Sequence, residues 1–180
     1  FYLSKNGNQT LGTTLNLTDN SRSQIFTSEF SEWLSWWPKN DIVTVTTKPS
    51  VNIEGFSYTI NTKTDKFNKL LGSIFGLTTK MGPNNITLYS RSVNKDLSTH
   101  LYNPNSRETT DLGLKTLPEK CTWNKNGDKA YCAIPKNLEP ASYPDSWYKG
   151  LISFNDAIWE VNLDSLVFVR IIDLEEEGGE

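Results

Sequence analysis

An internal repeat constrains this chain more than any other feature. Four segments each place a short turn after an alternating strand: residues 15–21 (LNLTDNS), 58–64 (YTINTKT), 100–106 (HLYNPNS) and 159–165 (WEVNLDS). Their last apolar residues of inward type are Leu17, Ile60, Tyr102 and Val161, at spacings of 43, 42 and 59 residues. A recurring period of this size indicates one supersecondary unit stacked on copies of itself.

A second series with the same period precedes the first. Its segments are residues 1–4 (FYLS), 43–47 (VTVTT), 87–91 (TLYSR) and 130–134 (AYCAI). The aligned residues are Tyr2, Val45, Tyr89 and Tyr131, at spacings of 43, 44 and 42. Four short strands in a unit of 40 to 45 residues are typical of a β-propeller blade.

The repeat therefore predicts an all-β fold, a β-propeller of four-stranded antiparallel blades, with just under four blades in this chain. The predicted units are a partial blade at 1–30, blades at 31–73 and 74–116, a blade at 117–172 with an inserted loop at 135–156, and an acidic tail at 173–180. We name the strands of a blade a to d, from the innermost outward; the first blade lacks strand a. We expect the remaining strands to come from sequence outside this chain or from a second copy.

Two stretches leave a helical interpretation open. Residues 28–37 (SEFSEWLSWW) and 65–76 (DKFNKLLGSIFG) place apolar side chains at helix-like spacing, so either could be a short helix that joins two blades. Composition favours strands instead, because Asn, Thr and Ser are abundant, and six Trp, seven Tyr and eight Phe supply apolar material for a β core.

Both cysteines lie in one predicted hairpin, residues 121–132 (CTWNKNGDKAYC). A type I′ turn at Asn126-Gly127 would pair Cys121 directly with Cys132, at a Cα separation that a disulfide tolerates. A disulfide there would place the protein outside a reducing cytosol. The alternative is two free, half-buried cysteines on neighbouring strands.

The turns between strands a and b carry a family resemblance. Residues 37–41 (WPKND) and 123–128 (WNKNGD) loosely match the Trp-Ser-Pro-Asp-Gly-type turn of TolB-type and WD-repeat-like propellers, and residues 81–85 (MGPNN) match it more weakly. Residues 117–135 and 143–154 also resemble uncharacterised bacterial propeller proteins of the cell envelope. The resemblance implies a propeller fold and an extracytoplasmic or envelope location in a bacterium, and it names no reaction. The hydrogen-bond tetrad of eukaryotic WD repeats is not expected, because no Gly-His pair and no Trp-Asp strand ending occur.

Several classes of function find no support in the sequence. A net charge of -3 and a pI near 5.3 argue against a nucleic-acid partner, and no apolar run is long enough to span a bilayer. We expect no cofactor and no metal, because phosphate-cradling glycine loops are absent and two thiols without a nearby histidine fall short of a zinc site. His100 occupies the position of Leu15, Tyr58 and Trp159, so we expect it to be packed and hydrogen-bonded.

Catalysis is left undecided, and no catalytic residue is assigned. No G-x-S-x-G motif occurs. Asp145 and Asp156 are candidate carboxylates that do not lie in turns between strands a and b, where Asp ordinarily caps backbone amides. A glycan-active propeller that uses either one is a third hypothesis, ranked after the two given in the next paragraph.

The last blade carries an insertion of 17 residues between strands b and c. Long loops on a rigid scaffold often carry recognition, and Tyr and Trp are favoured contact residues. The candidate binding residues are Tyr143, Asp145, Trp147, Tyr148, Lys149 and Asp156. The alternative is that the aromatic side chains fold back as a lid over the blade's own core. The leading hypothesis is a non-catalytic scaffold that binds protein or glycan at this rim; its rival is the accessory propeller of a hydrolase, a peptidase or glycosidase, with catalytic residues outside the chain.

Overall fold

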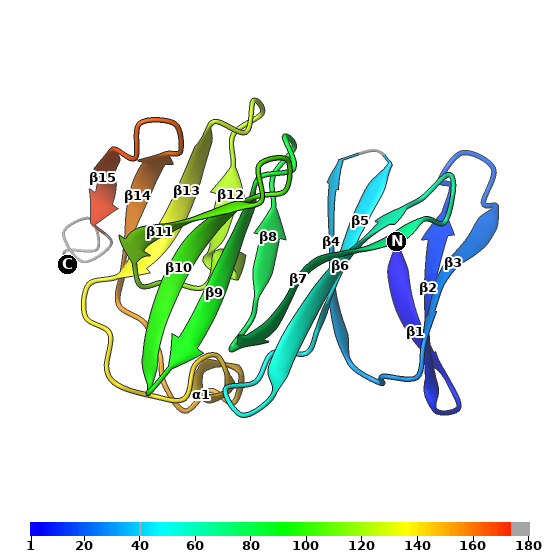
Figure 1. Cartoon of the computed structure of the whole chain (residues 1–180), viewed down its shortest axis with the longest axis horizontal. Helices are drawn as coiled ribbons and strands as arrows, with labels where there is room; N and C mark the ends of the chain where they lie inside the picture. Colours follow the sequence, from blue (N-terminus) through cyan, green and yellow to red (C-terminus); the bar gives the residue numbers. More distant parts are fainter. Residues whose placement is uncertain (40, 174–180) are drawn as a thin grey trace, which may run out of the picture.

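The chain folds into four antiparallel sheets that stand side by side in chain order (Figure 1). This is a computed structural model, and it describes residues 1–39 and 41–173. The strands are β1 (Tyr2–Asn6), β2 (Gln9–Leu15) and β3 (Arg22–Ser28) in the first blade; β4 (Trp33–Lys39), β5 (Ile42–Thr47), β6 (Glu54–Asn61) and β7 (Phe67–Phe75) in the second; β8 (Thr79–Met81), β9 (Thr87–Val93), β10 (Asp96–Asn103) and β11 (Glu108–Leu114) in the third; and β12 (Cys121–Trp123), β13 (Lys129–Pro135), β14 (Asp156–Asn162) and β15 (Phe168–Asp173) in the fourth.

Each sheet is a simple meander, so the predicted propeller blades are confirmed. The first has three strands in the order β1-β2-β3, and the other three have four each. Both stretches with helix-like spacing are strands, β4 and β7. The predicted acidic tail lies outside the described residues apart from Asp173, which ends β15.

Among the described residues, helical structure is confined to two short pieces near the insertion. A 3-10 turn spans Pro118–Lys120, and helix α1 spans Asp145–Tyr148 within the inserted loop. The sequence pattern did not predict α1, because a single turn of helix has no measurable periodicity. In the part of the chain that the structure describes, no helix is long and apolar enough to cross a membrane.

Strand c of every blade contains a β-bulge and, three residues later, an asparagine. A bulge lies immediately before Thr13, Tyr58, His100 and Trp159. Three residues later the strand reaches an asparagine, Asn16, Asn61, Asn103 or Asn162, whose side-chain oxygen accepts hydrogen bonds from backbone amides of the turn to strand d. Asparagine suits this position because its short amide can replace a backbone acceptor in a turn.

The positions of these bulges and asparagines correct the predicted alignment of the repeats at two places. Leu17 is 86% exposed in the turn after β2, and Leu15 takes the inward position, so the true spacing to Ile60 is 45 residues. In the fourth blade Cys132, rather than Tyr131, pairs with Trp159 and is the counterpart of the earlier strand-b residues. The first error arose because Leu17 lies beyond the end of β2, and the second because Tyr131 and Cys132 occupy opposite faces of β13.

The core consists of layers between facing sheets. Between the first two blades the buried residues are Ile25, Phe26, Val43, Val45 and Ile60. Between the last two they include Leu88, Leu112, Ala130, Cys132 and Val161. A third cluster, around Leu97, Leu117 and Tyr143, lies under the insertion.

The predicted disulfide is confirmed. Cys121 pairs with Cys132 in the β12–β13 ladder, the two sulfur atoms are bonded, and the Cα atoms are 4.0 Å apart. Both cysteines are buried in the layer between the third and fourth blades. The alternative of two free thiols is therefore wrong.

The turn that closes this hairpin is not type I′ as predicted. Gly127 has a positive φ of 79° and Asn126 does not, whereas type I′ needs both. The Asn124 side chain accepts hydrogen bonds from the amides of Gly127 (2.8 Å) and Lys129 (3.2 Å), which favours a wider loop. A type I′ pair occurs instead at Asn94 and Lys95, with φ values of 52° and 65°.

Candidate functional site

The insertion packs along one rim of the molecule. Figure 1 shows α1 at the lower rim and the β12–β13 turn at the upper rim, so the insertion lies at the rim opposite that turn. Tyr143 is 1% exposed, and its hydroxyl donates to the Glu139 carbonyl at 2.5 Å. Its own backbone carbonyl lies beside Gly76, where an added Cβ would come within 2.9 Å of it. Tyr143 thus anchors the loop in the core.

Asp145 ties the insertion to the second blade. Its carboxylate accepts hydrogen bonds from the Val51 amide at 2.8 Å and from the Ser50 hydroxyl at 3.2 Å. Ser50 and Val51 belong to the connection between β5 and β6, more than 90 residues away in the chain. The loop therefore leaves and re-enters the fourth blade, and its middle is held to the second blade.

Trp147 and Tyr148 lie side by side on α1 but face different surroundings. The half-buried Trp147 ring lies 6.1 Å from the Phe154 ring and packs on the cluster around Tyr143. Tyr148 is 37% exposed, and its hydroxyl donates to the Glu119 carboxylate at 2.7 Å. Packing thus accounts for Trp147, whereas Tyr148 is available at a surface.

The remaining two candidate residues do not join Tyr148. Lys149 is exposed at the end of α1, and the structure gives its side chain no described contact. Asp156 pairs with Lys120 at 2.5 Å, and the Lys120 ammonium group lies 4.0 Å above the Phe154 ring. Burial lowers the pKa of Lys120, and its contact with Asp156 opposes this shift. The six candidate residues therefore do not form a single site.

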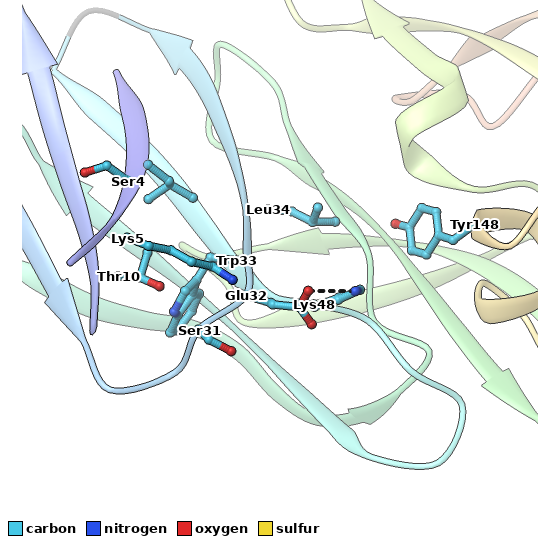
Figure 2. Close-up of a pocket in the computed structure, with 10 residues that line it drawn as sticks. Ser4, Lys5, Thr10, Ser31, Glu32, Trp33, Leu34, Lys48 and Tyr148 are labelled. Carbon is cyan, nitrogen blue, oxygen red and sulfur yellow. Dashed lines mark hydrogen bonds and ion pairs between the residues drawn. The ribbon is translucent and has the colours of Figure 1, made fainter. Parts of the chain in front are cut away.

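Tyr148 instead closes one end of a groove between the first two blades, which we call the β1–β4 groove. Its volume is about 380 Å³. It is lined by Leu3, Ser4, Lys5 and Thr10 of the first blade, Ser31, Glu32, Trp33, Leu34 and Lys48 of the second, and Tyr148. Figure 2 shows Ser4, Lys5 and Thr10 on one side, Trp33 and Leu34 in the middle, and Tyr148 opposite.

The groove combines apolar walls with a charged edge. Leu34 and Trp33 provide apolar surface, while Lys48 and Glu32 form an ion pair at 2.9 Å, drawn as a dashed line in Figure 2. Lys48 holds the pKa of Glu32 below its ordinary value by hydrogen bonding and by charge. Such a mixture suits a ligand that has both apolar and polar groups.

A smaller hollow of about 100 Å³ adjoins the groove at Leu34 and contains Glu119 and Lys80. Burial raises the pKa of Glu119, although the Tyr148 hydroxyl opposes the shift, and burial lowers the pKa of Lys80. The Lys80 ammonium group lies 3.5 Å from the centre of the Trp36 ring. The charged groups here are engaged with other protein groups.

His100 is packed and hydrogen-bonded as predicted, although its counterpart in the first blade is Thr13 and not Leu15. Its ring stacks on Tyr89 with centroids 5.0 Å apart, and Nε2 is 2.8 Å from the Ser98 hydroxyl. Burial lowers the pKa of His100. No group of three or more His, Cys, Asp or Glu side chains suited to hold a metal ion occurs within residues 1–39 and 41–173.

Sequence reasoning missed most of the groove. Residues of the first two blades line it, and nothing in their local pattern marks them as surface-forming. Tyr148 completes the lining, and it comes from the insertion, more than 100 residues from the first blade in the chain.

Four stacked antiparallel meanders define this chain as part of a β-propeller. No family model matches the sequence, and no curated protein matches it either. Solved structures of propeller-like fold do match.

Three of these structures illustrate the likeness. TolB from Acinetobacter baumannii has a TM-score of 0.64 at 11% identity, over 96% of this chain and 40% of that one. Uncharacterized protein lmo1340 from Listeria monocytogenes EGD-e has a TM-score of 0.63 at 10% identity, over 95% and 49%. An oligogalacturonate lyase in complex with manganese has a TM-score of 0.59 at 12% identity, over 92% and 41%. The chain thus spans less than half the length of each, and identities this low show the fold alone.

Proposed function

We propose that this chain is a non-catalytic interaction module of an extracytoplasmic, envelope-associated bacterial propeller protein. It binds a protein or glycan partner at the rim that carries residues 135–156. The observation that carries the proposal is the β1–β4 groove, about 380 Å³ in volume, to which the inserted loop contributes the exposed Tyr148. Ligand sites are commonly hollows of this size with mainly apolar walls and a few polar groups.

The proposed location draws on independent support. The Cys121–Cys132 disulfide is stable in an oxidising compartment and is unusual in the cytosol of mesophiles. The turn motifs that resemble TolB-type propellers point to the same location.

A binding screen tests the function. The labelled protein is applied to an oligosaccharide array and to a displayed library of random peptides, and the affinity of each hit is measured for two variants. Tyr148→Ala is expected to weaken groove ligands at least tenfold. Trp37→Ala is the matched control, because Trp37 is an aromatic residue of similar exposure, 39%, that does not line the groove. Equal losses in both variants, or the absence of any ligand, would overturn the proposal.

The rival, an accessory propeller of a hydrolase, differs in what adjoins these residues. The full-length reading frame distinguishes the two, because a catalytic segment with a nucleophile elbow would favour the hydrolase.

A further inference from the structure

The smaller hollow beside Leu34, which we call the Lys80–Glu119 hollow, lies where three segments meet. Trp36 comes from β4, Lys80 from β8 and Glu119 from the 3-10 turn at Pro118–Lys120. These segments form or adjoin the innermost strands of the second, third and fourth blades. Packing of these blades thus brings one basic and one acidic side chain to the same hollow.

The two charges of the hollow are held by neutral groups and not by each other. The Lys80 ammonium group lies 3.5 Å from the centre of the Trp36 ring, and the Glu119 carboxylate accepts a hydrogen bond from the Tyr148 hydroxyl at 2.7 Å. Within residues 1–39 and 41–173 no ion pair joins Lys80 to Glu119, and each affects the pKa of the other through space only. Each charge is therefore held in place without being neutralised.

Both charged groups keep unused hydrogen-bonding capacity. In the described part of the chain no acceptor bonds to the Lys80 ammonium group, and Tyr148 is the only donor to the Glu119 carboxylate. Burial also disfavours the two charges, because it lowers the pKa of Lys80 and raises that of Glu119. Half-buried charges that line a hollow and lack a neutralising partner are typical of ligand sites.

We propose that the Lys80–Glu119 hollow binds a free amino acid as a zwitterion. Lys80 binds the ligand's carboxylate, and Glu119 binds its ammonium group. A ligand with a carboxylate alone would be repelled by Glu119, and a ligand with an ammonium group alone would be repelled by Lys80. A molecule that carries both groups on one carbon atom gains both attractions. The proposal goes beyond the function proposed above and does not require a partner in the β1–β4 groove.

The size and the lining of the hollow favour small amino acids. Its volume of about 100 Å³ is several times what one water molecule needs and well below that of a drug-sized pocket. Apart from Leu34 and Trp36, its uncharged lining residues all carry hydroxyl groups: Ser35, Thr44, Thr46 and Thr79. Such a wall offers little contact to a large apolar side chain. Glycine, alanine and serine are therefore the expected ligands.

Calorimetric titration with glycine, alanine and serine tests the proposal, and blocked forms of alanine provide the comparison. N-acetylalanine lacks the ammonium group and alaninamide lacks the carboxylate, while both keep the methyl side chain. We expect saturable binding of alanine and at least tenfold weaker binding of each blocked form. This comparison uses the unaltered protein, so it does not depend on the folding of any variant.

Two variants assign the ligand's groups to the two side chains. Glu119→Gln removes the charge that binds the ammonium group, so alanine should bind at least tenfold more weakly and no better than N-acetylalanine. Lys80→Met keeps an unbranched side chain beside Trp36 but removes its charge, so alanine should again lose at least tenfold and bind no better than alaninamide. Each variant thus cancels the effect of one blocking group only, as a double-mutant cycle requires.

The matched controls have similar contacts outside the hollow. Lys69→Met removes an ammonium group that lies 4.9 Å from the centre of the Phe56 ring, and Glu160→Gln removes a carboxylate that accepts from the Tyr131 hydroxyl at 3.0 Å. Neither Lys69 nor Glu160 lines the hollow. Both control variants should change the affinity for alanine less than threefold.

Three results would each overturn the proposal. They are the lack of saturable binding by all three amino acids at millimolar concentration, a blocked form that binds as well as alanine, and a control variant that weakens alanine as much as its counterpart. The binding screen described above is decided separately. If alanine fails while the screen yields a groove ligand that depends on Tyr148, the amino-acid proposal falls and the proposed function stands.

Discussion

At the scale of single residues, one asparagine at the end of strand c has the same role in each of the four blades: its side chain accepts hydrogen bonds from the turn that follows. Asn16, Asn61, Asn103 and Asn162 each accept hydrogen bonds from turn amides that would otherwise face solvent. The predicted alignment followed apolar residues and did not use these asparagines, although they recur at the same place in all four blades. A search for the recurring Asn would have placed Leu15 correctly.

Replacing one of these asparagines tests their contribution. The Asn61 side chain accepts from the Lys63 and Thr64 amides, both at 3.0 Å. Asn61→Ala is expected to lower the free energy of unfolding by about 1 kcal/mol, a usual value for one net hydrogen bond. Urea denaturation measures the change. Asn68→Ala, at an exposed position on β7, is the control and should be nearly neutral; equal losses would contradict the role of the turn.

Glu119 makes stability depend on pH in a defined direction. Burial raises its pKa above the ordinary 4.5, so the folded state binds a proton that the unfolded state releases, and Glu119 reduces stability as pH rises through that interval. Glu119→Gln does not titrate and can still accept from Tyr148. Its melting temperature relative to the unaltered protein should therefore increase from pH 4 upward and then level off.

Glu32 serves as the control, because its pKa is shifted in the opposite direction to that of Glu119. Lys48 lowers the pKa of the exposed Glu32, so Glu32→Gln should give a small loss of stability above about pH 4.5 that fades at lower pH. Parallel pH profiles for the two variants would contradict the assignment for Glu119.

At the scale of elements, the insertion acts mainly as a brace with one exposed face. Tyr143 and Trp147 contact the core, Asp145 bonds to the second blade, and Tyr148 reaches the groove. The sequence indicated an aromatic-rich loop but left two alternatives open, a lid over the core or a binding surface. The structure shows that Tyr143 and Trp147 pack on the core and that Tyr148 is exposed, which periodicity in an irregular loop cannot predict.

This division predicts different effects of two neighbouring substitutions. Trp147→Ala removes a half-buried ring from a packed cluster and is expected to cost about 2 to 3 kcal/mol of stability. Tyr148→Ala exposes little of the core and should cost less than about 1 kcal/mol while affecting the groove. Thermal unfolding compares the two. A larger loss from Tyr148→Ala would assign that side chain to packing.

The disulfide stabilises the inner hairpin of the fourth blade. The two cysteines are 11 residues apart in sequence. Reduction of this short cross-link is expected to lower the free energy of unfolding by about 2 to 3 kcal/mol. Urea denaturation with and without dithiothreitol measures the difference. The double variant Cys121→Ala, Cys132→Ala is the control and should not respond to the reductant. An equal response in both proteins would show that dithiothreitol acts elsewhere.

At the scale of the whole molecule, the repeat period predicted the blades and their strands, because each blade needs the same length of chain. It could not reveal which surfaces the blades leave open. The turn at Asn126 shows the limit locally: a strong hairpin signal was overridden by the side chain of Asn124. The groove shows the same limit for the whole molecule, because Tyr148 of a distant loop lines it together with residues of the first two blades.

The outer strand of the fourth blade exposes apolar side chains. Val167, Val169 and Ile171 are all exposed on or beside β15. We expect the isolated 180-residue chain to self-associate as concentration rises, because such a surface is unfavourable in water. The double variant Val169→Lys, Ile171→Lys should shift it toward monomer in sedimentation velocity experiments. Unchanged association would place the contact elsewhere, with Leu17→Lys as the control at an exposed turn.

The hydrogen bonds of Asp145 to Ser50 and Val51 have a mechanical consequence. The inserted loop leaves the fourth blade, passes the third and is hydrogen-bonded to the second. These three blades are therefore coupled and cannot tilt independently of one another. The first blade lies outside this connection and is joined to its neighbour by one packed layer. Load along the chain would therefore concentrate at the seam between the first and second blades, where the groove opens.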